Sequence, residues 1–289
     1  MSFFQIVVLA LVQGFAELLP VSSSAHVIVA EKLLGLDPAS PEMTLLLVML
    51  HTGTMASVIV YFWRRWRRAF FENRRDSARF ARLLILATAL TGAVGAALIE
   101  TIEKCCFHGA PHAWIEQWFS RLDLIAPALA SAGILILAAA LWDKRPRVLQ
   151  TAGDSGLTTK QAGLIGAAQG LCLPFRGFSR SGATISTAIL AGVPKALAED
   201  FSFALAVVLT PPAIARETWR LLRTQQIRDS ANLIHAMAPS LLGMTLAFAA
   251  GLVALKWLSR WLGNGRWYLF GIYCLAAAAF LEVLHPIGY

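Results

Sequence analysis

Apolar residues recur along the chain in runs of about twenty, separated by short clusters of charge, Pro or Gly. A helix of that length crosses the roughly 30 Å of hydrocarbon in a bilayer. The ten-residue alternation that is typical of a membrane β-barrel is missing from the sequence. The pattern therefore predicts an all-α polytopic membrane protein. Its six spanning helices are expected at about 43–62, 83–100, 123–142, 200–219, 233–256 and 266–285.

Two further apolar stretches, 3–35 and 161–193, are interrupted near their middle by Pro and a Ser-rich polar turn. Irregular backbone at membrane depth is tolerated where protein or a polar cavity surrounds it. These stretches therefore predict two re-entrant helical hairpins with polar tips, at residues 20–26 and 174–184.

Basic residues orient the predicted spans. The segment 63–82, which we expect to be a loop, holds eight arginines and should be cytoplasmic. Threading onward gives this side fifteen Lys and Arg residues and the other side seven. The two hairpins are then expected to enter the membrane from opposite sides. Their sequences also show a weak internal similarity, in which Gln13-Gly14 aligns with Gln169-Gly170. An inverted-topology repeat with a site near the bilayer midplane follows.

The predicted organisation is a single integral-membrane domain. Its parts are a first repeat at 1–100, a connecting segment with one span at 101–160, a second repeat at 161–256 and a C-terminal span at 257–289.

Composition narrows the functional classes. Hydrophobic residues make up 57% of the 289 positions and charged residues 15%, with a mean hydropathy of +0.62, which excludes an ordinary water-soluble enzyme. The net charge is +8, and the basic residues lie at the ends of the apolar runs. We therefore expect these residues to contact membrane lipids and not nucleic acid. The four cysteines show no metal-binding spacing.

The first tip carries acid, hydroxyl and imidazole groups. Gln13 and Glu17 share one helical face, as do Ser23 and His26 on the next helix. The serines at 22–24 predict a helix N-cap that favours an anion. The alternative is a capped, kinked helix whose polar groups only satisfy backbone atoms. A carboxylate inside the membrane is costly, however, and usually marks function.

The second tip is cationic and rich in hydroxyl groups, and it is typical of a phosphate-binding site. Snorkelling arginines at the membrane interface are the alternative. The candidate ligands are Arg176, Gly177, Ser179, Arg180, Ser181 and Thr184. Together the two tips offer a nucleophile, a base and a guanidinium, which are the groups that phosphoryl transfer requires.

These two runs resemble the motifs of the undecaprenyl-diphosphate phosphatases, the bacitracin-resistance family of bacterial integral-membrane proteins. The (E/Q)xxxE and PVSSxxH pattern is matched by Gln13, Glu17, Pro20 to Ser23 and His26. The PGxSRSxxT pattern is matched from Gly177 to Thr184, with Arg176 where the family has Pro. Gln13 leaves Glu17 as the only carboxylate of the first motif.

The resemblance implies removal of the terminal phosphate of undecaprenyl diphosphate, in the bacterial inner membrane, at a site open to the periplasm. Glu17, Ser23, His26 and Arg180 are the expected catalytic residues. Gln13, Ser22, Ser24, Arg176, Gly177, Ser179, Ser181 and Thr184 are the expected substrate-binding residues. A divalent cation, Mg²⁺ or Ca²⁺, with Glu17 as a ligand, comes from the resemblance alone.

Several alternatives stay open at this point. A lipid-phosphate transporter or flippase would use the same repeat and arginines. Either Ser23 or His26 is the nucleophile, and either His26 or Glu17 is the base for Ser23. His51 is either a neighbour of the site or a satisfied intramembrane histidine. A homodimer is compatible with the sequence, but nothing in the sequence requires one.

Overall fold

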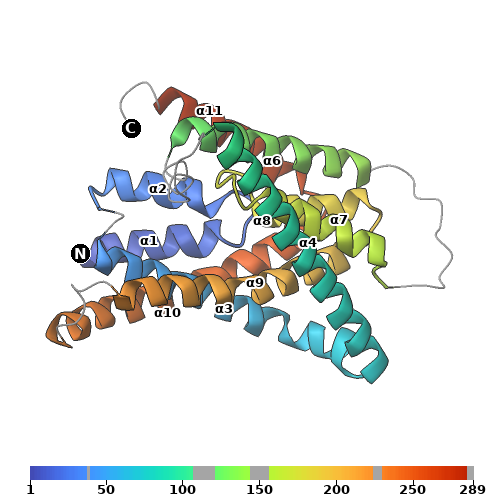
Figure 1. Ribbon diagram of the computed structural model, residues 1–289, viewed down its shortest axis with the longest axis horizontal. Helices are drawn as coiled ribbons and strands as arrows, with labels where there is room; N and C mark the ends of the chain where they lie inside the picture. The colour runs from blue at the N-terminus through green and yellow to red at the C-terminus, as the bar shows by residue number, and fades with distance from the viewer. Residues whose placement is uncertain (38–39, 107–120, 144–155, 224–229, 285–289) are drawn as a thin grey trace. The chain divides into compact units, whose positions relative to one another are not determined.

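The structure is a computed structural model that describes residues 1–37, 40–106, 121–143, 156–223 and 230–284. Within these ranges all regular structure is helical (Figure 1), so the all-α prediction is confirmed. In chain order the helices are α1 (Phe3–Ala16), α2 (Ser23–Leu33), α3 (Pro41–Trp66), the π-helix η1 (Arg67–Phe71), α4 (Arg74–Cys106), α6 (Leu122–Asp143), α7 (Thr159–Leu171), α8 (Arg180–Leu190), α9 (Lys195–Arg223), α10 (Ser230–Gly263) and α11 (Tyr268–Leu284).

The first five predicted spans lie inside α3, α4, α6, α9 and α10. These five are the helices in the described ranges that are long and apolar enough to cross a membrane. The sixth predicted span coincides with α11, an apolar but shorter helix of 17 residues. The chain is therefore a multi-pass membrane protein. Much of the predicted connecting segment, at 107–120 and 144–155, lies outside the described residues.

The two interrupted stretches are two helix pairs, as predicted. α1 and α2 form the first pair and α7 and α8 the second (Figure 1). Each pair begins with a capping box, in which Ser2 pairs with Gln5 and Thr158 with Gln161. The similarity between the two pairs thus extends to their first helical turns. Their entry from opposite sides of the membrane stays a prediction.

The chain divides into two compact units. The first comprises Met1–Leu19, Ser23–Trp63 and Ala206–Leu258, and the second comprises Pro20–Ser22, Arg64–Leu205 and Ser259–Tyr289. Small residues mediate helix packing in each, as is usual in membrane proteins. In the first unit a Cβ on Gly14 would lie 2.6 Å from Ala250 Cβ of α10. In the second unit a Cβ on Gly170 would lie 2.8 Å from Val94 Cβ of α4.

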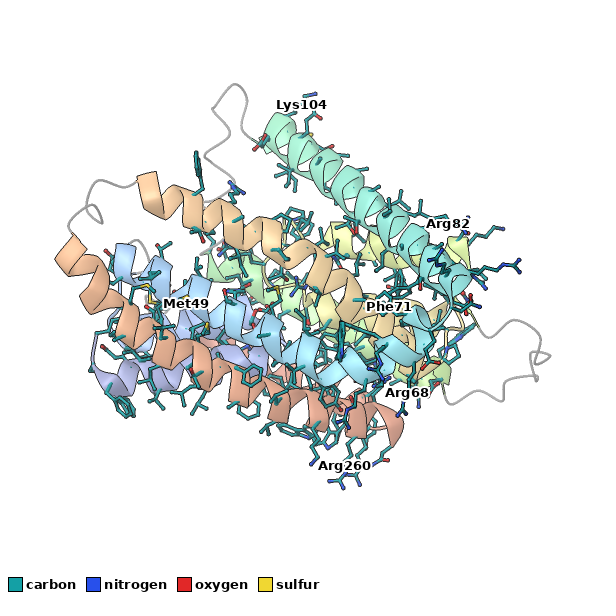
Figure 2. All side chains as sticks on the ribbon, turned by 90° about the horizontal axis from the view of Figure 1, so that it is seen from below. Met49, Arg68, Phe71, Arg82, Lys104 and Arg260 are labelled. Carbon is teal, nitrogen blue, oxygen red and sulfur yellow. The ribbon has the colours of Figure 1, made fainter. Side chains whose placement is uncertain are left out.

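The arginine-rich segment 63–82 is mostly helical, so the predicted loop was wrong. α3 continues to Trp66, η1 follows, and α4 starts at Arg74. The segment contains neither Gly nor Pro to end a helix. Its turn is closed by the Ser77 hydroxyl, which donates to the Phe70 carbonyl at 2.7 Å. Figure 2 shows Arg82 near this turn and Lys104 at the other end of α4.

A buried charge cluster joins the end of α3 to α9 within the second unit. The Arg65 guanidinium lies 3.1 Å from Glu199 Oε2 and 3.1 Å from Asp200 Oδ2. Both carboxylates are buried, and Glu199 also accepts a hydrogen bond from Ser259. Two acidic side chains inside a membrane protein are thus held by one guanidinium and neighbouring hydrogen-bond donors.

Candidate active site

The first tip is organised around Glu17, the C-cap residue of α1, whose backbone N–H donates to the Gln13 carbonyl. Gln13, one turn earlier, is 1% exposed, and its Nε2 donates to Glu17 Oε2 at 3.2 Å. The predicted shared face of these two side chains is therefore confirmed. The Glu17 side chain is 12% exposed, so its charge is held in a largely desolvated setting.

Ser23, the first residue of α2, donates its hydroxyl to the same carboxylate oxygen. The distance from Ser23 Oγ to Glu17 Oε2 is 2.6 Å. A serine becomes a nucleophile when a base within hydrogen-bonding distance takes its proton. Of the two bases that the sequence left open, Glu17 has this geometry. Ser24 and His26 follow on α2 and are half-buried.

His51 is a neighbour of Glu17 that the sequence motif does not contain. Its Nε2 lies 3.7 Å from Glu17 Oε2, and its Nδ1 lies 2.8 Å from the Leu47 carbonyl oxygen. A hydrogen bond to that carbonyl puts the ring proton on Nδ1 and turns Nε2 towards the carboxylate. The only sequence signal was a histidine inside a predicted spanning helix, which did not identify a partner.

The residues that join α1 to α2 have unusual backbone geometry. Ser22 has a φ of 65°, in the left-handed region that non-glycine residues rarely occupy. Its conformation therefore differs from the extended one of an ordinary N-cap, which the sequence predicted at 22–24. The Ser22 hydroxyl donates to the Arg176 carbonyl at 2.9 Å. The Pro20 carbonyl accepts from Cys274 Sγ at 3.1 Å, and all four residues belong to the second unit.

In the second tip, a serine caps the helix that carries the key arginine. Ser179 is the N-cap of α8 with an extended backbone, and its Oγ accepts from the Gly182 N–H at 3.2 Å. Arg180, the first residue of α8, is half-buried, whereas Ser181 is 7% exposed. An arginine in the first turn of a helix adds a positive charge at the helix terminus that itself favours an anion.

Other residues of the second motif hold the tip in place. Gly177 is buried against α6, where a Cβ would lie 2.8 Å from the Ile125 carbonyl carbon. The Thr184 hydroxyl donates to the Arg180 carbonyl at 2.9 Å and shares a short hydrogen bond with Ser202 of α9. Arg176 is exposed. Substrate binding by these three residues stays a prediction.

A divalent cation would find few protein ligands at the first tip. Among the described residues, no group of three or more His, Cys, Asp or Glu side chains could hold a metal ion. Glu17 is the only carboxylate of the first motif, and it already accepts hydrogen bonds from Gln13 and Ser23. Mg²⁺ often binds through one carboxylate together with substrate phosphates. The residues therefore fit a cation only as part of a metal–diphosphate complex.

A model of the bacitracin resistance protein BacA family matches residues 6–280, which include both tips. The chain belongs to the BacA family. It is 53% identical to undecaprenyl-diphosphatase 2 of Acinetobacter baylyi over 279 residues, which cover 96% of this chain and 95% of the relative. It is 33% identical to undecaprenyl-diphosphatase 2 of Burkholderia orbicola over 300 residues, covering 99% of both chains. Undecaprenyl-diphosphatase 1 of Burkholderia pseudomallei is 33% identical over 294 residues, covering 97% of this chain and 96% of that one. The resemblance to BacA proteins thus extends from the two motifs over nearly the whole chain.

Proposed function

We propose that the chain is an undecaprenyl-diphosphate phosphatase. It removes the terminal phosphate of undecaprenyl diphosphate and returns undecaprenyl phosphate to peptidoglycan synthesis as a lipid carrier. The observation that carries the proposal is the 2.6 Å hydrogen bond from Ser23 Oγ to Glu17 Oε2, because it pairs a nucleophile with a base inside a motif of the BacA family. The names of the relatives support the same substrate.

The reaction begins at Ser23. Glu17 takes the hydroxyl proton while Ser23 Oγ attacks the terminal phosphorus. The bond from that phosphorus to the bridging oxygen breaks, and undecaprenyl phosphate leaves with the electron pair. Water then attacks the phosphoserine, and inorganic phosphate leaves with one proton of that water while the other passes to solvent. Ser23 Oγ recovers the proton that Glu17 took. Gln13, which donates to Glu17 at 3.2 Å, holds the carboxylate in position throughout.

Arg180 stabilises the negative charge that spreads over the equatorial oxygens of the transferring phosphoryl group. The first turn of α8 adds N–H groups with the same polarity. That Arg180 acts on the same diphosphate head as Ser23 and Glu17 stays a prediction from the two sequence motifs.

A divalent cation would be held by Glu17 together with the diphosphate, and it would neutralise part of the substrate's charge. The predicted location of the tips within the membrane would suit a substrate with a long isoprenoid tail. We place the protein in the bacterial inner membrane, with the phosphate released on the periplasmic side. Hydrolysis of undecaprenyl diphosphate also accounts for the connection of the BacA family with bacitracin resistance.

A phosphate-release assay on purified protein in detergent tests the activity. Without a membrane between two compartments, a transporter would leave the diphosphate intact, whereas a phosphatase releases inorganic phosphate. Ser23→Ala should abolish release, and Ser24→Ala, one residue later, should reduce it much less. Turnover by Ser23→Ala near the parental rate would remove Ser23 from the mechanism.

Trapping the covalent intermediate tests the nucleophile. A phosphoserine survives acid and is lost in alkali, and a phosphohistidine behaves in the opposite way. Quenching the enzyme with substrate labelled in the terminal phosphate should give an acid-stable label on Ser23. A label that is lost in mild acid and retained in alkali would instead assign the attack to His26.

A further inference from the structure

Gln169, near the end of α7, is a buried amide whose polar atoms are unmatched. The residue is 1% exposed, and neither Nε2 nor Oε1 of its side chain has a hydrogen-bond partner. Burying such a group lowers the free energy of unfolding, and native proteins rarely keep one without a reason. A ligand that binds the amide is one such reason.

The first hairpin shows what a glutamine at this place does when it has a partner. Gln13 is also 1% exposed and precedes a glycine packed closely on a neighbouring helix, as Gln169 does. Gln13 donates to Glu17, four residues later. Four residues after Gln169 stands Leu173, which has no polar side-chain atom. The second hairpin thus keeps the buried glutamine and lacks the carboxylate.

The register of α7 against α8 places Gln169 beside the candidate phosphate-binding turn. Gln161 Nε2 donates to the Ala191 carbonyl at 3.0 Å, which aligns the start of α7 with the end of α8. Moving about 12 Å along both antiparallel helices from this pair, at 1.5 Å per residue, leads to Gln169 on α7 and the first turn of α8. Cys172, three residues after Gln169, is the C-cap of α7, so Gln169 lies in the last turn of the helix, at the end that leads into the second tip.

We propose that Gln169 is a further substrate-binding residue, whose side-chain amide binds a phosphate group held at Arg180. Nε2 donates to an anionic phosphate oxygen, and Oε1 accepts from a water molecule or a protonated oxygen of the same group. Hydrogen bonds to charged acceptors are stronger than neutral ones, so a neutral amide contributes both affinity and orientation. This assignment rests on the proposed function, since it concerns the same diphosphate.

The test compares Gln169→Met with Thr88→Val. Methionine keeps the length of the side chain and removes both polar atoms. The substrate-free variant should unfold at or above the parental temperature, because no partner in the protein is lost. Its kcat/KM for undecaprenyl diphosphate should fall about tenfold to hundredfold. Farnesyl diphosphate, added as a probe of binding, should raise the unfolding temperature of the parent, and this rise should be smaller for Gln169→Met.

Thr88→Val is the matched control, because the buried Thr88 hydroxyl on α4 also lacks a partner. This variant should keep the parental kcat/KM and the parental response to farnesyl diphosphate. Gln169→Glu is a second probe: its carboxylate would repel the diphosphate, so its KM should rise above the parental value.

Two results would overturn the assignment. In the first, Gln169→Met keeps kcat/KM and the response to farnesyl diphosphate within about twofold of the parent. In the second, Gln169→Met unfolds at a temperature well below that of the parent, which would mean that the amide has a partner in the protein. The same experiment distinguishes failure of the proposed hydrolysis from failure of the binding role. If the parent releases no phosphate but is stabilised by farnesyl diphosphate, and Gln169→Met is not, the binding role stands without the reaction.

Discussion

Replacing Gly177 by alanine should disable the enzyme through a steric effect on the second tip. The new Cβ would lie 2.8 Å from the Ile125 carbonyl carbon, closer still to its oxygen, and 2.9 Å from Ala128 Cβ. These are backbone and first side-chain atoms of α6, so they cannot rotate away. Restoring ordinary contact at 3.4 Å requires a shift of more than half an ångström at the carbon and about 1.4 Å at the oxygen.

The shift would be transmitted to Ser179 and Arg180, which stand two and three residues after Gly177. A displacement of about 1 Å at a group that must meet a phosphate can reduce the rate about hundredfold. Overpacking should also lower the free energy of unfolding by about 1–3 kcal/mol. The assay is kcat/KM for phosphate release from undecaprenyl diphosphate, measured beside thermal unfolding of the same samples.

Two other glycines serve as controls. A Cβ on Gly182 would lie 3.1 Å from Ile136 Cδ1 and Ser179 Oγ and 3.2 Å from Ser179 Cβ, and a shift of only a few tenths of an ångström relieves these contacts. Gly182→Ala should therefore stay within about threefold of the parental kcat/KM. A methyl group on Gly92 of α4 would have no described neighbour within 4 Å outside its own helix, so alanine there should be neutral or stabilising. Parental activity in Gly177→Ala, or a larger loss in Gly182→Ala, would refute the steric argument.

Three further substitutions test other parts of the structure. Arg180→Lys should lower kcat/KM at least tenfold, because an ammonium cannot reproduce the bidentate fork on a phosphate; activity within about threefold would make Arg180 structural. His51→Ala should lower kcat about tenfold, because it removes an imidazole whose Nε2 lies 3.7 Å from the Glu17 carboxylate. A kcat within about twofold of the parent would leave His51 a packing residue. Arg65→Ala should lower the free energy of unfolding by about 3 kcal/mol in chemical denaturation, since it strands the two buried carboxylates of α9. Parental stability would show that those carboxylates need no counter-charge.

Hydropathy and helix-breaking residues were enough to predict the helices and the two interrupted hairpins. The lengths of apolar runs reflect the thickness of the bilayer, and Pro20 and Pro174 mark places where a helix cannot continue. The same reasoning failed at 63–82, because a high density of arginine indicates a side of the membrane but does not by itself end a helix. The contact between Glu17 and Ser23 was foreseen as an option, since both residues flank one short turn.

Contacts between distant helices could not be predicted in this way. His51 and Glu17 meet because α3 packs near the end of α1, and no local pattern specifies that packing. The close fit of Gly177 against Ile125 is another example, because the motif suggested room for a ligand and the neighbouring helix was not foreseeable. The separation between Glu17 and Arg180, which a shared site requires to be short, stays a prediction.

The segment Pro20–Ser22 has a consequence for the order in which the protein is made. Its Ser22 hydroxyl and Pro20 carbonyl are bonded to Arg176 and Cys274, which lie 154 and 254 residues further along the chain. At a synthesis rate of 5–20 residues per second, these partners emerge about 8–30 s and 13–50 s later. The left-handed turn at Ser22 therefore lacks these bonds during most of translation, and the first hairpin acquires its final tip only after nearly the whole chain has left the ribosome.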